Sequence, residues 1–123
     1  ILKYGFNRTR LKYNFDFATA HSTGFFIKKK SMDLLKKFNT SFEFSADYDL
    51  YYRALIKFKL KGDYTNKRDL IGIFGSGGYS SKIGFFDKLI EESKIRIHNK
   101  QNLLLVSLIF INAVIKNYLK KLF

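Results

Sequence analysis

Two carboxylates in one short stretch are the residues of this sequence best suited to chemistry. Asp47 and Asp49 lie two positions apart, and Arg53 follows Asp49 at a spacing of four. In the first turn of a helix, Asp47 is either ordinary helix-start chemistry, stabilised by unpaired amides, or a general base kept in a cleft. Asp49 and Arg53 have the spacing of an intrahelical ion pair worth a few tenths of a kcal/mol. The two acids are therefore not expected to be equivalent.

The helix that positions these acids is predicted to begin after Ser45, a favourable N-cap residue. Its apolar positions recur at helical spacing and comprise Leu50, Tyr51, Ala54 and Phe58. Upstream, Ser31 is expected to cap a short helix that ends at Phe38, and residues 39–41 form a turn. The acids would thus lie at the start of the central helix.

Three short strands are predicted around these helices. Residues 13–27 alternate between apolar and polar side chains, and the small polar residues at 21–24 divide them into two strands. Residues 69–74 form the third. Residues 75–81, which include three glycines, then form a loop that is either a flexible connector or a backbone surface close to phosphate or sugar. It is not a Walker loop, because Gly-Lys-Ser/Thr is missing.

Two helices joined by a polar hinge are predicted at the C-terminal end. The first, residues 82–97, places Ile83, Phe86, Ile90 and Ile97 near one face. The second, residues 103–123, has a seam spaced four, three, four, three, four that comprises Leu104, Leu108, Ile111, Ile115, Tyr118 and Leu122. Its most apolar part, residues 103–115, is shorter than the ~20 residues needed to span a bilayer. The helix therefore either packs against other protein or a second copy, or lies in a membrane surface with its lysines at the headgroups.

The charge of the chain favours polyanionic partners. Its 123 residues include 23 Lys plus Arg against 10 Asp plus Glu, a net charge of +13, which attracts nucleic acid, anionic lipid or phosphorylated small molecules. Nucleic acid is disfavoured, because neither the interleaved Arg and aromatic residues of a ribonucleoprotein sheet nor a helix-turn-helix spacing is present. The absence of Cys excludes disulfides and Cys-ligated zinc, and no signal-peptide pattern is present.

The order of these features resembles the C-terminal half of bacterial family 2 glycosyltransferases, the inverting enzymes of A-type fold that build surface polysaccharides. The resemblance covers roughly residues 15–97, and its motifs are His21-Ser22-Thr23 before Phe25-Phe26-Ile27, then Ser45-Ala46-Asp47-Tyr48-Asp49, then Gly77-Gly78-Tyr79-Ser80-Ser81. It implies an α/β fold with short mixed strands and helices, followed by C-terminal amphipathic helices. Residues 1–97 would form the acceptor-side portion with the catalytic base, and residues 98–123 a helix for membrane-surface or partner packing.

The resemblance also implies roles for individual residues. Asp47 matches the catalytic base, and Asp49 and Arg53 match the structural or acceptor-side residues that follow it. His21 matches a histidine that borders the active site and contacts metal or donor phosphate, although serine and not glutamine follows it here. The remaining substrate-binding positions match Ser22, Gly77, Gly78, Tyr79 and Ser80.

In such an enzyme one carboxylate takes the proton of the acceptor hydroxyl, while a divalent cation, Mg²⁺ or Mn²⁺, neutralises the departing nucleoside diphosphate. The family's N-terminal half with its Asp-x-Asp metal ligands is absent, so the chain is expected to be a fragment, inactive alone and an enzyme only when that half is supplied. Expected partners are a nucleotide-sugar donor and a glycan or lipid-linked acceptor, with peripheral membrane contact through residues 103–123 and homodimerisation. The expected location is the cytoplasm, at the inner face of the cell membrane. The alternative is a non-enzymatic basic module that binds an anionic membrane surface or nucleic acid.

Overall fold

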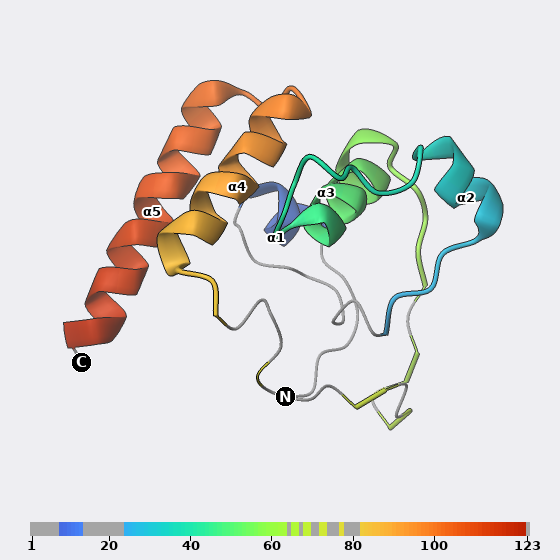
Figure 1. The fold of residues 1–123 in the computed structure, drawn as a ribbon, viewed down its shortest axis with the longest axis horizontal. Helices are drawn as coiled ribbons and strands as arrows, with labels where there is room; N and C mark the ends of the chain where they lie inside the picture. The colour runs from blue at the N-terminus through green and yellow to red at the C-terminus, as the bar shows by residue number, and fades with distance from the viewer. Residues whose placement is uncertain are drawn as a thin grey trace.

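A set of packed helices makes up the part of the chain that the computed structural model describes (Figure 1). The helices are α1 (Arg8–Tyr13), α2 (Lys29–Leu34), α3 (Ala46–Tyr52), α4 (Phe85–His98) and α5 (Leu103–Leu122), and α3 continues directly into a π-helical turn (Arg53–Lys57). The described residues are 8–13, 24–63, 65–66, 68–69, 72–73, 77 and 82–122. α4 and α5 lie side by side as an antiparallel pair, and α3 packs against α4.

The predicted α/β fold class is wrong for this part of the chain, where every regular element is helical and no strand occurs. Residues 24–27 and the described residues of the predicted strand 69–74 have no regular sheet structure, and Tyr13, where the first strand was predicted to begin, belongs to the helix α1. The other residues of the three predicted strands lie outside the described ranges. A short apolar run such as 25–27 is compatible with a strand or with simple packing. Here packing prevails, because the Phe25 ring lies edge-on to Tyr51 with ring centres 4.3 Å apart.

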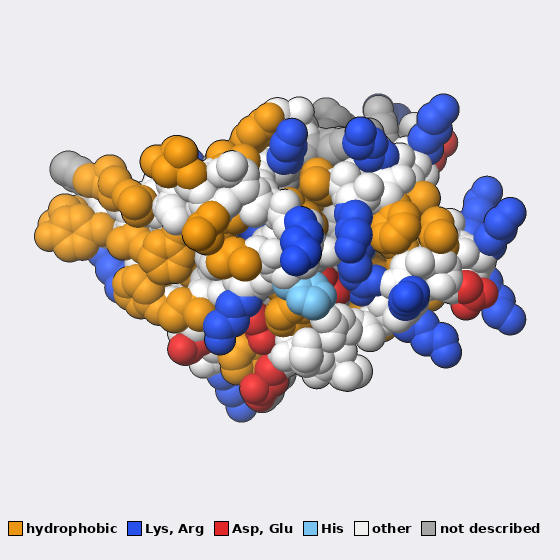
Figure 2. Space-filling view, turned by 90° about the horizontal axis from the view of Figure 1, so that it is seen from above, with side chains coloured by type: hydrophobic (Ala, Val, Ile, Leu, Met, Phe, Trp, Pro, Cys, Tyr) orange, Lys and Arg blue, Asp and Glu red, His pale blue; other side chains and the backbone are white. Residues whose placement is uncertain are grey.

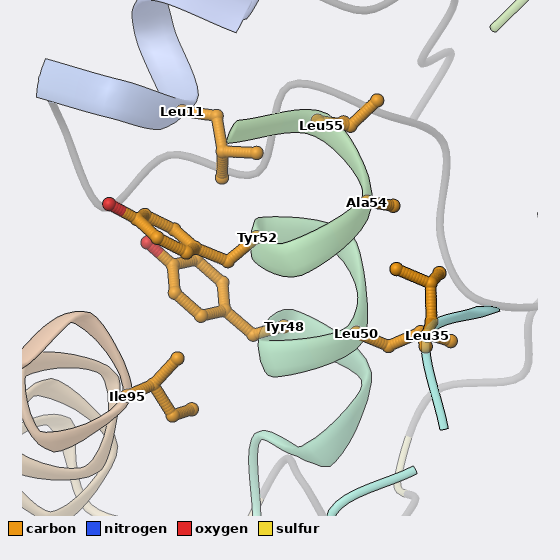
Figure 3. Packing of buried hydrophobic residues seen from close by; sticks show 8 residues of the cluster. All are labelled: Leu11, Leu35, Tyr48, Leu50, Tyr52, Ala54, Leu55 and Ile95. Atoms are coloured by element: carbon orange, nitrogen blue, oxygen red, sulfur yellow. The ribbon is translucent and has the colours of Figure 1, made fainter. Parts of the chain in front are cut away.

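The hydrophobic core is built on α3 and its π-helical turn (Figure 3). Its eight buried side chains are each at most 5 % exposed and comprise Leu11, Leu35, Tyr48, Leu50, Tyr52, Ala54, Leu55 and Ile95. The helical spacing of the sequence correctly predicts burial of Leu50, Tyr51 and Ala54, but Phe58 is 40 % exposed. The π-helical turn explains the difference, because the Phe58 amide bonds five residues back to the Arg53 carbonyl and shifts the face on which later side chains lie.

Four of the five α-helices that the structure describes are predicted, although their ends differ, whereas α1 was not expected. The predicted apolar face of α4 is wrong, because Phe86, Ile90 and Ile97 are 44–53 % exposed and Leu89 and Ile95 are buried instead. α2 ends at Leu34 and not at Phe38, since Lys36 and Lys37 adopt left-handed φ angles of 58° and 61°. α4 is closed by a left-handed residue of the same kind, Lys100, with a φ of 64°.

Ser45 does occupy the N-cap position of α3, but its side chain makes no capping bond, and its buried Oγ has no hydrogen-bond partner among the described residues. The prediction that α3 begins after Ser45 is therefore confirmed, without a hydrogen bond from the capping side chain. The predicted cap of the preceding helix, Ser31, is wrong, because Lys28 holds the N-cap position of α2.

A fully buried arginine of α4 joins four segments of the fold. The Arg96 guanidinium donates hydrogen bonds to the carbonyls of Leu11 at 2.6 Å and Lys12 at 2.9 Å, to Gln101 Oε1 at 2.9 Å and to the hydroxyl of Tyr48. It also lies over the rings of Tyr48 and Tyr52, 5.7 and 5.3 Å from their centres. Because these partners come from α1, α3 and the α4–α5 loop, one side chain fixes the position of α4.

We expect Arg96→Lys to destabilise the protein by about 2–4 kcal/mol, because an ammonium group cannot satisfy a planar set of acceptors in a buried site. The free energy of unfolding in urea measures the effect. The matched control is Lys94→Arg, the reverse exchange at an exposed position of the same helix, which should change stability by no more than about 0.5 kcal/mol. Equal unfolding midpoints for the two variants would contradict the role of Arg96.

Candidate functional site

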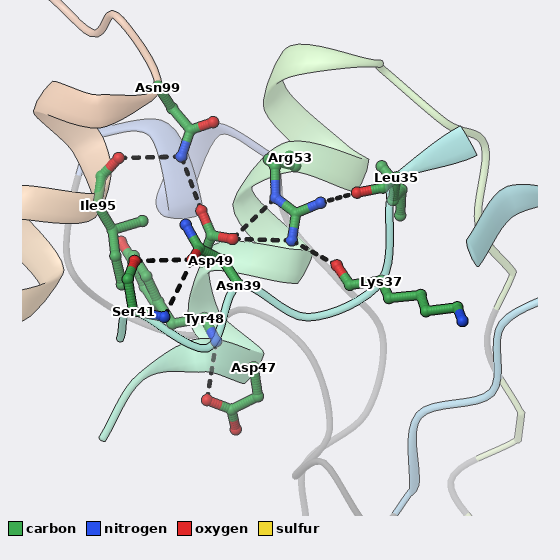
Figure 4. A network of polar contacts seen from close by, with 10 residues as sticks. All are labelled: Leu35, Lys37, Asn39, Ser41, Asp47, Tyr48, Asp49, Arg53, Ile95 and Asn99. Atoms are coloured by element: carbon green, nitrogen blue, oxygen red, sulfur yellow. Dashed lines mark hydrogen bonds and ion pairs between the residues drawn. The ribbon is translucent and has the colours of Figure 1, made fainter. Parts of the chain in front are cut away.

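Asp49 lies at the centre of a buried polar network (Figure 4). Its side chain has no exposed surface. Oδ2 accepts a hydrogen bond from Nε of Arg53 at 2.8 Å and forms an ion pair with its Nη2 at 2.8 Å, and Oδ1 accepts a hydrogen bond at 2.9 Å from the amide of Asn99. The predicted i,i+4 ion pair is therefore confirmed, but as a buried link between α3 and the end of α4.

Arg53 extends this network to the segment after α2. Its guanidinium donates to the carbonyl of Leu35 and, at 2.8 Å, to that of Lys37. These carbonyls flank the two left-handed residues, Lys36 and Lys37, whose backbone conformation is costly for residues with a side chain. The arginine therefore stabilises an otherwise unfavourable turn. Asp49 and Arg53 thus hold the framework together.

Asp47 stands apart from the network, and its carboxylate points away from Asp49 and Arg53 (Figure 4). It lies half-buried in the first turn of α3, where Oδ1 accepts a hydrogen bond at 2.8 Å from the amide of Tyr48. Burial and then the charge of Asp47 raise the pKa of Tyr51. A partly exposed carboxylate held at a helix start can accept a proton from a hydroxyl group that reaches it.

The segment that leads into Asp47 is held from α4. Glu91 accepts a hydrogen bond from the amide of Glu43 at 2.7 Å through Oε1 and from the amide of Phe44 at 2.8 Å through Oε2. Both carboxylate oxygens thus bind successive backbone N–H groups just upstream of α3. This contact fixes the approach of the chain to Asp47. The spacing of acids in the sequence gives no indication of it, because 47 residues separate the partners.

A second buried carboxylate, Glu92, lines a groove between α4 and α5. The groove has a volume of about 420 Å³, and its other lining includes Lys88, Lys116 and Lys120. Burial raises the pKa of Glu92 to about 7, the charges of Lys88 and Arg96 oppose that rise, and those of Asp47 and Glu91 add to it. Lys88 lies close to Glu92, with Nζ 3.9 Å from Oε1. Sequence reasoning missed this group, since Glu92 reads as one more charge on an amphipathic helix.

Arg53 also lines a basic cleft of about 440 Å³. Apolar and cationic side chains share its wall, including Leu34, Phe38, Phe58, Lys36, Lys57 and His98. The ring of His98 also lies edge-on to Phe42, with centres 5.9 Å apart. Arg53 of the framework pair lines this cleft, whereas Asp49 and Asp47 are not among its lining residues.

The structure brings only part of the predicted site together. Asp47, Asp49 and Arg53 belong to α3 and its π-helical extension. Gly77 is described and has a φ of 95°, a left-handed conformation that suits glycine. The other predicted positions lie outside the described residues: His21, Ser22, Gly78, Tyr79 and Ser80. Their roles stay predictions.

The residues that the structure describes do not fit a divalent metal. Among them, no three His, Asp or Glu side chains converge as ligands would. Asp49 cannot serve, because Arg53 and Asn99 occupy its oxygens. A metal with the predicted chemistry would need ligands from elsewhere, and no step of a reaction is assigned to it.

Comparison of the sequence with protein-family models, with curated proteins and with solved structures finds no match.

We expect Asp49→Asn to destabilise the protein by about 3 kcal/mol, because it removes the counter-charge of Arg53 inside the fold. Asp47→Asn makes the same chemical change two residues away and should cost no more than about 1 kcal/mol, the value of a carboxylate in a first helical turn. Urea unfolding of both variants tests the contrast. Similar losses would mean that Asp47 is also a framework residue.

Glu92 should make stability depend on pH. Its pKa is 4.5 when unfolded and about 7 when folded, so its contribution is fully present below pH 4.5 and is lost as the pH rises through 7. The rise corresponds to about 3 kcal/mol. Glu92→Gln should remove this loss, so its stability relative to the native protein should increase between pH 4.5 and 8. Asp33→Asn, at an exposed carboxylate, should show no such trend in urea unfolding, and a flat difference for Glu92→Gln would contradict the assignment.

Proposed function

We propose that this chain provides the acceptor-side portion of an inverting glycosyltransferase, with Asp47 as the catalytic base. The observation that supports this best is the difference between the two neighbouring carboxylates. The oxygens of Asp49 bind Arg53 and Asn99, whereas Asp47 lies half-buried at the start of α3 and points away from them (Figure 4). This difference agrees with the roles that the resemblance implies for the two positions.

The reaction needs only one base on this side. The acceptor hydroxyl oxygen forms a bond to the anomeric carbon of the donor, the bond from that carbon to the nucleoside diphosphate breaks, and Asp47 receives the hydroxyl proton. The diphosphate leaves as an anion and is a good leaving group, so no second carboxylate is required as an acid. The hydrogen bonds of Glu91 to the amides of residues 43 and 44 hold the base in position. Such positioning lowers the entropic part of the activation barrier for transfer.

The acceptor and the donor would be held by different parts of the enzyme. Donor recognition and the metal belong to an Asp-x-Asp half that these 123 residues do not contain. The net charge of +13 favours an acceptor that bears phosphate, such as a lipid-linked saccharide, over a neutral one. The proposal concerns a helical acceptor-side region and depends on no sheet.

The DNA upstream of the Ile1 codon provides the first test. An in-frame or frame-shifted extension that encodes a strand followed by Asp-x-Asp would supply the donor half and support the proposal. A stop codon, a true start and no such motif in that region would contradict it. So would transfer of sugar from a nucleotide donor by these 123 residues alone.

In the gene product that includes the donor half, Asp47→Asn should lower kcat for transfer by about 10²–10⁴-fold, the usual contribution of a general base. Binding of the nucleotide sugar, measured by calorimetry, should not change, because the amide keeps the size of the carboxylate and the donor is bound elsewhere. Asp33→Asn serves as the control and should keep full activity. Wild-type transfer by Asp47→Asn would exclude Asp47 as the base.

A further inference from the structure

The apolar seam of α5 faces away from the rest of the chain. Its side chains are between 51 and 69 % exposed and comprise Leu104, Leu108, Ile111, Ile115, Tyr118 and Leu122. α5 is instead anchored through Val106 and Ile109, which are buried on the side towards α4. Figure 2 shows hydrophobic side chains gathered over this end of the molecule. An exposed apolar surface of this extent marks an interaction site.

The charges of α5 are all of one sign. Lys116, Lys120 and Lys121 occupy its last turns, and residues 103–122 include no Asp or Glu. The net charge of the whole chain, α5 included, is +13. Lys116 and Lys120 line the groove towards α4, and Lys121 is not among its lining residues. A helix with an apolar face, lysines on its other sides and no acids is complementary to a surface that is apolar below and anionic at its rim.

A second copy of the chain suits this surface less well. Pairing along the seam would involve six side chains from each copy, whereas stable protein interfaces use about 20–30 residues a side. No acid on α5 is available to pair with the lysines of the other copy, and two chains of +13 repel each other. Charge and interface size therefore both disfavour a dimer.

A membrane-spanning arrangement also fits poorly. By length and composition alone, Leu103–Leu122 is apolar enough to cross a bilayer. The part without charge, residues 103–115, would reach only about 20 Å of the roughly 30 Å of hydrocarbon. α4 packs along α5 and carries charged groups, among them the buried Glu92 and Arg96. Insertion across the bilayer would bring those charges into lipid.

We propose that α5 lies in the surface of an anionic phospholipid bilayer, with its outward seam in the acyl boundary and Lys121, beside the seam, at the phosphate headgroups. Lys116 and Lys120, on the groove side of the helix, add to the attraction for the anionic surface. A helix bound in this way sinks about 5–10 Å into the headgroup region, and its long lysines extend sideways to the phosphates. α4 and the core then stay on the aqueous side. This inference is independent of the proposed transfer reaction.

Co-sedimentation of the chain with vesicles tests it, using phosphatidylcholine alone or mixed with phosphatidylglycerol. We expect binding to the anionic vesicles, weak binding to the neutral ones, and release at about 1 M salt, where the Debye length is about 3 Å. Replacing Lys116, Lys120 and Lys121 by Gln should weaken binding about fivefold per lysine. Equal binding to both vesicle types, with no effect of salt, would overturn the headgroup contact.

The apolar contact is tested by Ile111→Glu, at a seam position that is 53 % exposed. It should reduce vesicle binding at least tenfold, because a charge replaces a side chain that enters the acyl boundary. Phe26→Glu makes a comparable change at an 80 % exposed side chain outside α5 and should reduce binding less than twofold. Leu104→Glu repeats the test if Ile111→Glu fails to fold by circular dichroism.

Two results would overturn the proposal. One is a chain that ignores anionic vesicles and sediments as a dimer that Ile111→Glu dissociates, since a second copy would then cover α5. The other is equal vesicle binding by Ile111→Glu and Phe26→Glu, which would mean that the net charge of the chain, and not the seam of α5, causes the binding. Neither result bears on Asp47, so failure here and failure of the transferase proposal can be told apart.

Discussion

The structure depends on the requirement that a charge without solvent must have protein partners. Asp49 and Arg96 both have 0 % exposed surface. Asp49 draws together α3, the turn after α2 and the end of α4, and Arg96 joins α4 to α1, α3 and the α4–α5 loop. In a chain of this size the apolar core is small, so these polar contacts decide which helix packs where.

Carboxylates that are close in the sequence therefore have different roles: one stabilises the fold, and another stays available for a reaction. Asp49 is buried and held by Arg53 and Asn99, so its oxygens are not open to a ligand. Asp47, on the same helix, is held by one backbone amide and stays partly open. Glu92 shows a third environment, where burial favours the neutral acid. Three carboxylates of one small domain thus have three different properties, each set by its surroundings.

The sequence allowed four of the five described α-helices to be predicted, but not α1 and not the fold class. The helical spacing from Ala46 onward, the hinge before Leu103 and the Asp49–Arg53 pair are local features, and the structure confirms them. The strand prediction was wrong for residues 25–27, because three apolar residues suit packing against Tyr51 as well as a sheet.

The partners of Glu91 and Arg96 escaped prediction, whereas the outward direction of the α5 seam was one of two alternatives that the sequence left open. Periodicity shows which residues share a face but not what covers that face. For Phe58 the predicted face of the helix was also wrong, since a π-helical turn lies between Phe58 and the residues used to predict its position. The partners of Arg96 on α1 lie 84 and 85 residues away, a separation that no local pattern reports.

The two backbone amides held by Glu91 belong to no helix, yet a carboxylate covers both of them. Their exchange with deuterium therefore requires Glu91 to release them, while the amides of α3 and α4 exchange only when those helices open. Residues 43 and 44 are thus a built-in reporter of how often α4 separates from the segment that leads into Asp47. A ligand that pulls these two parts together would slow exchange at these amides, even where both helices keep their full length.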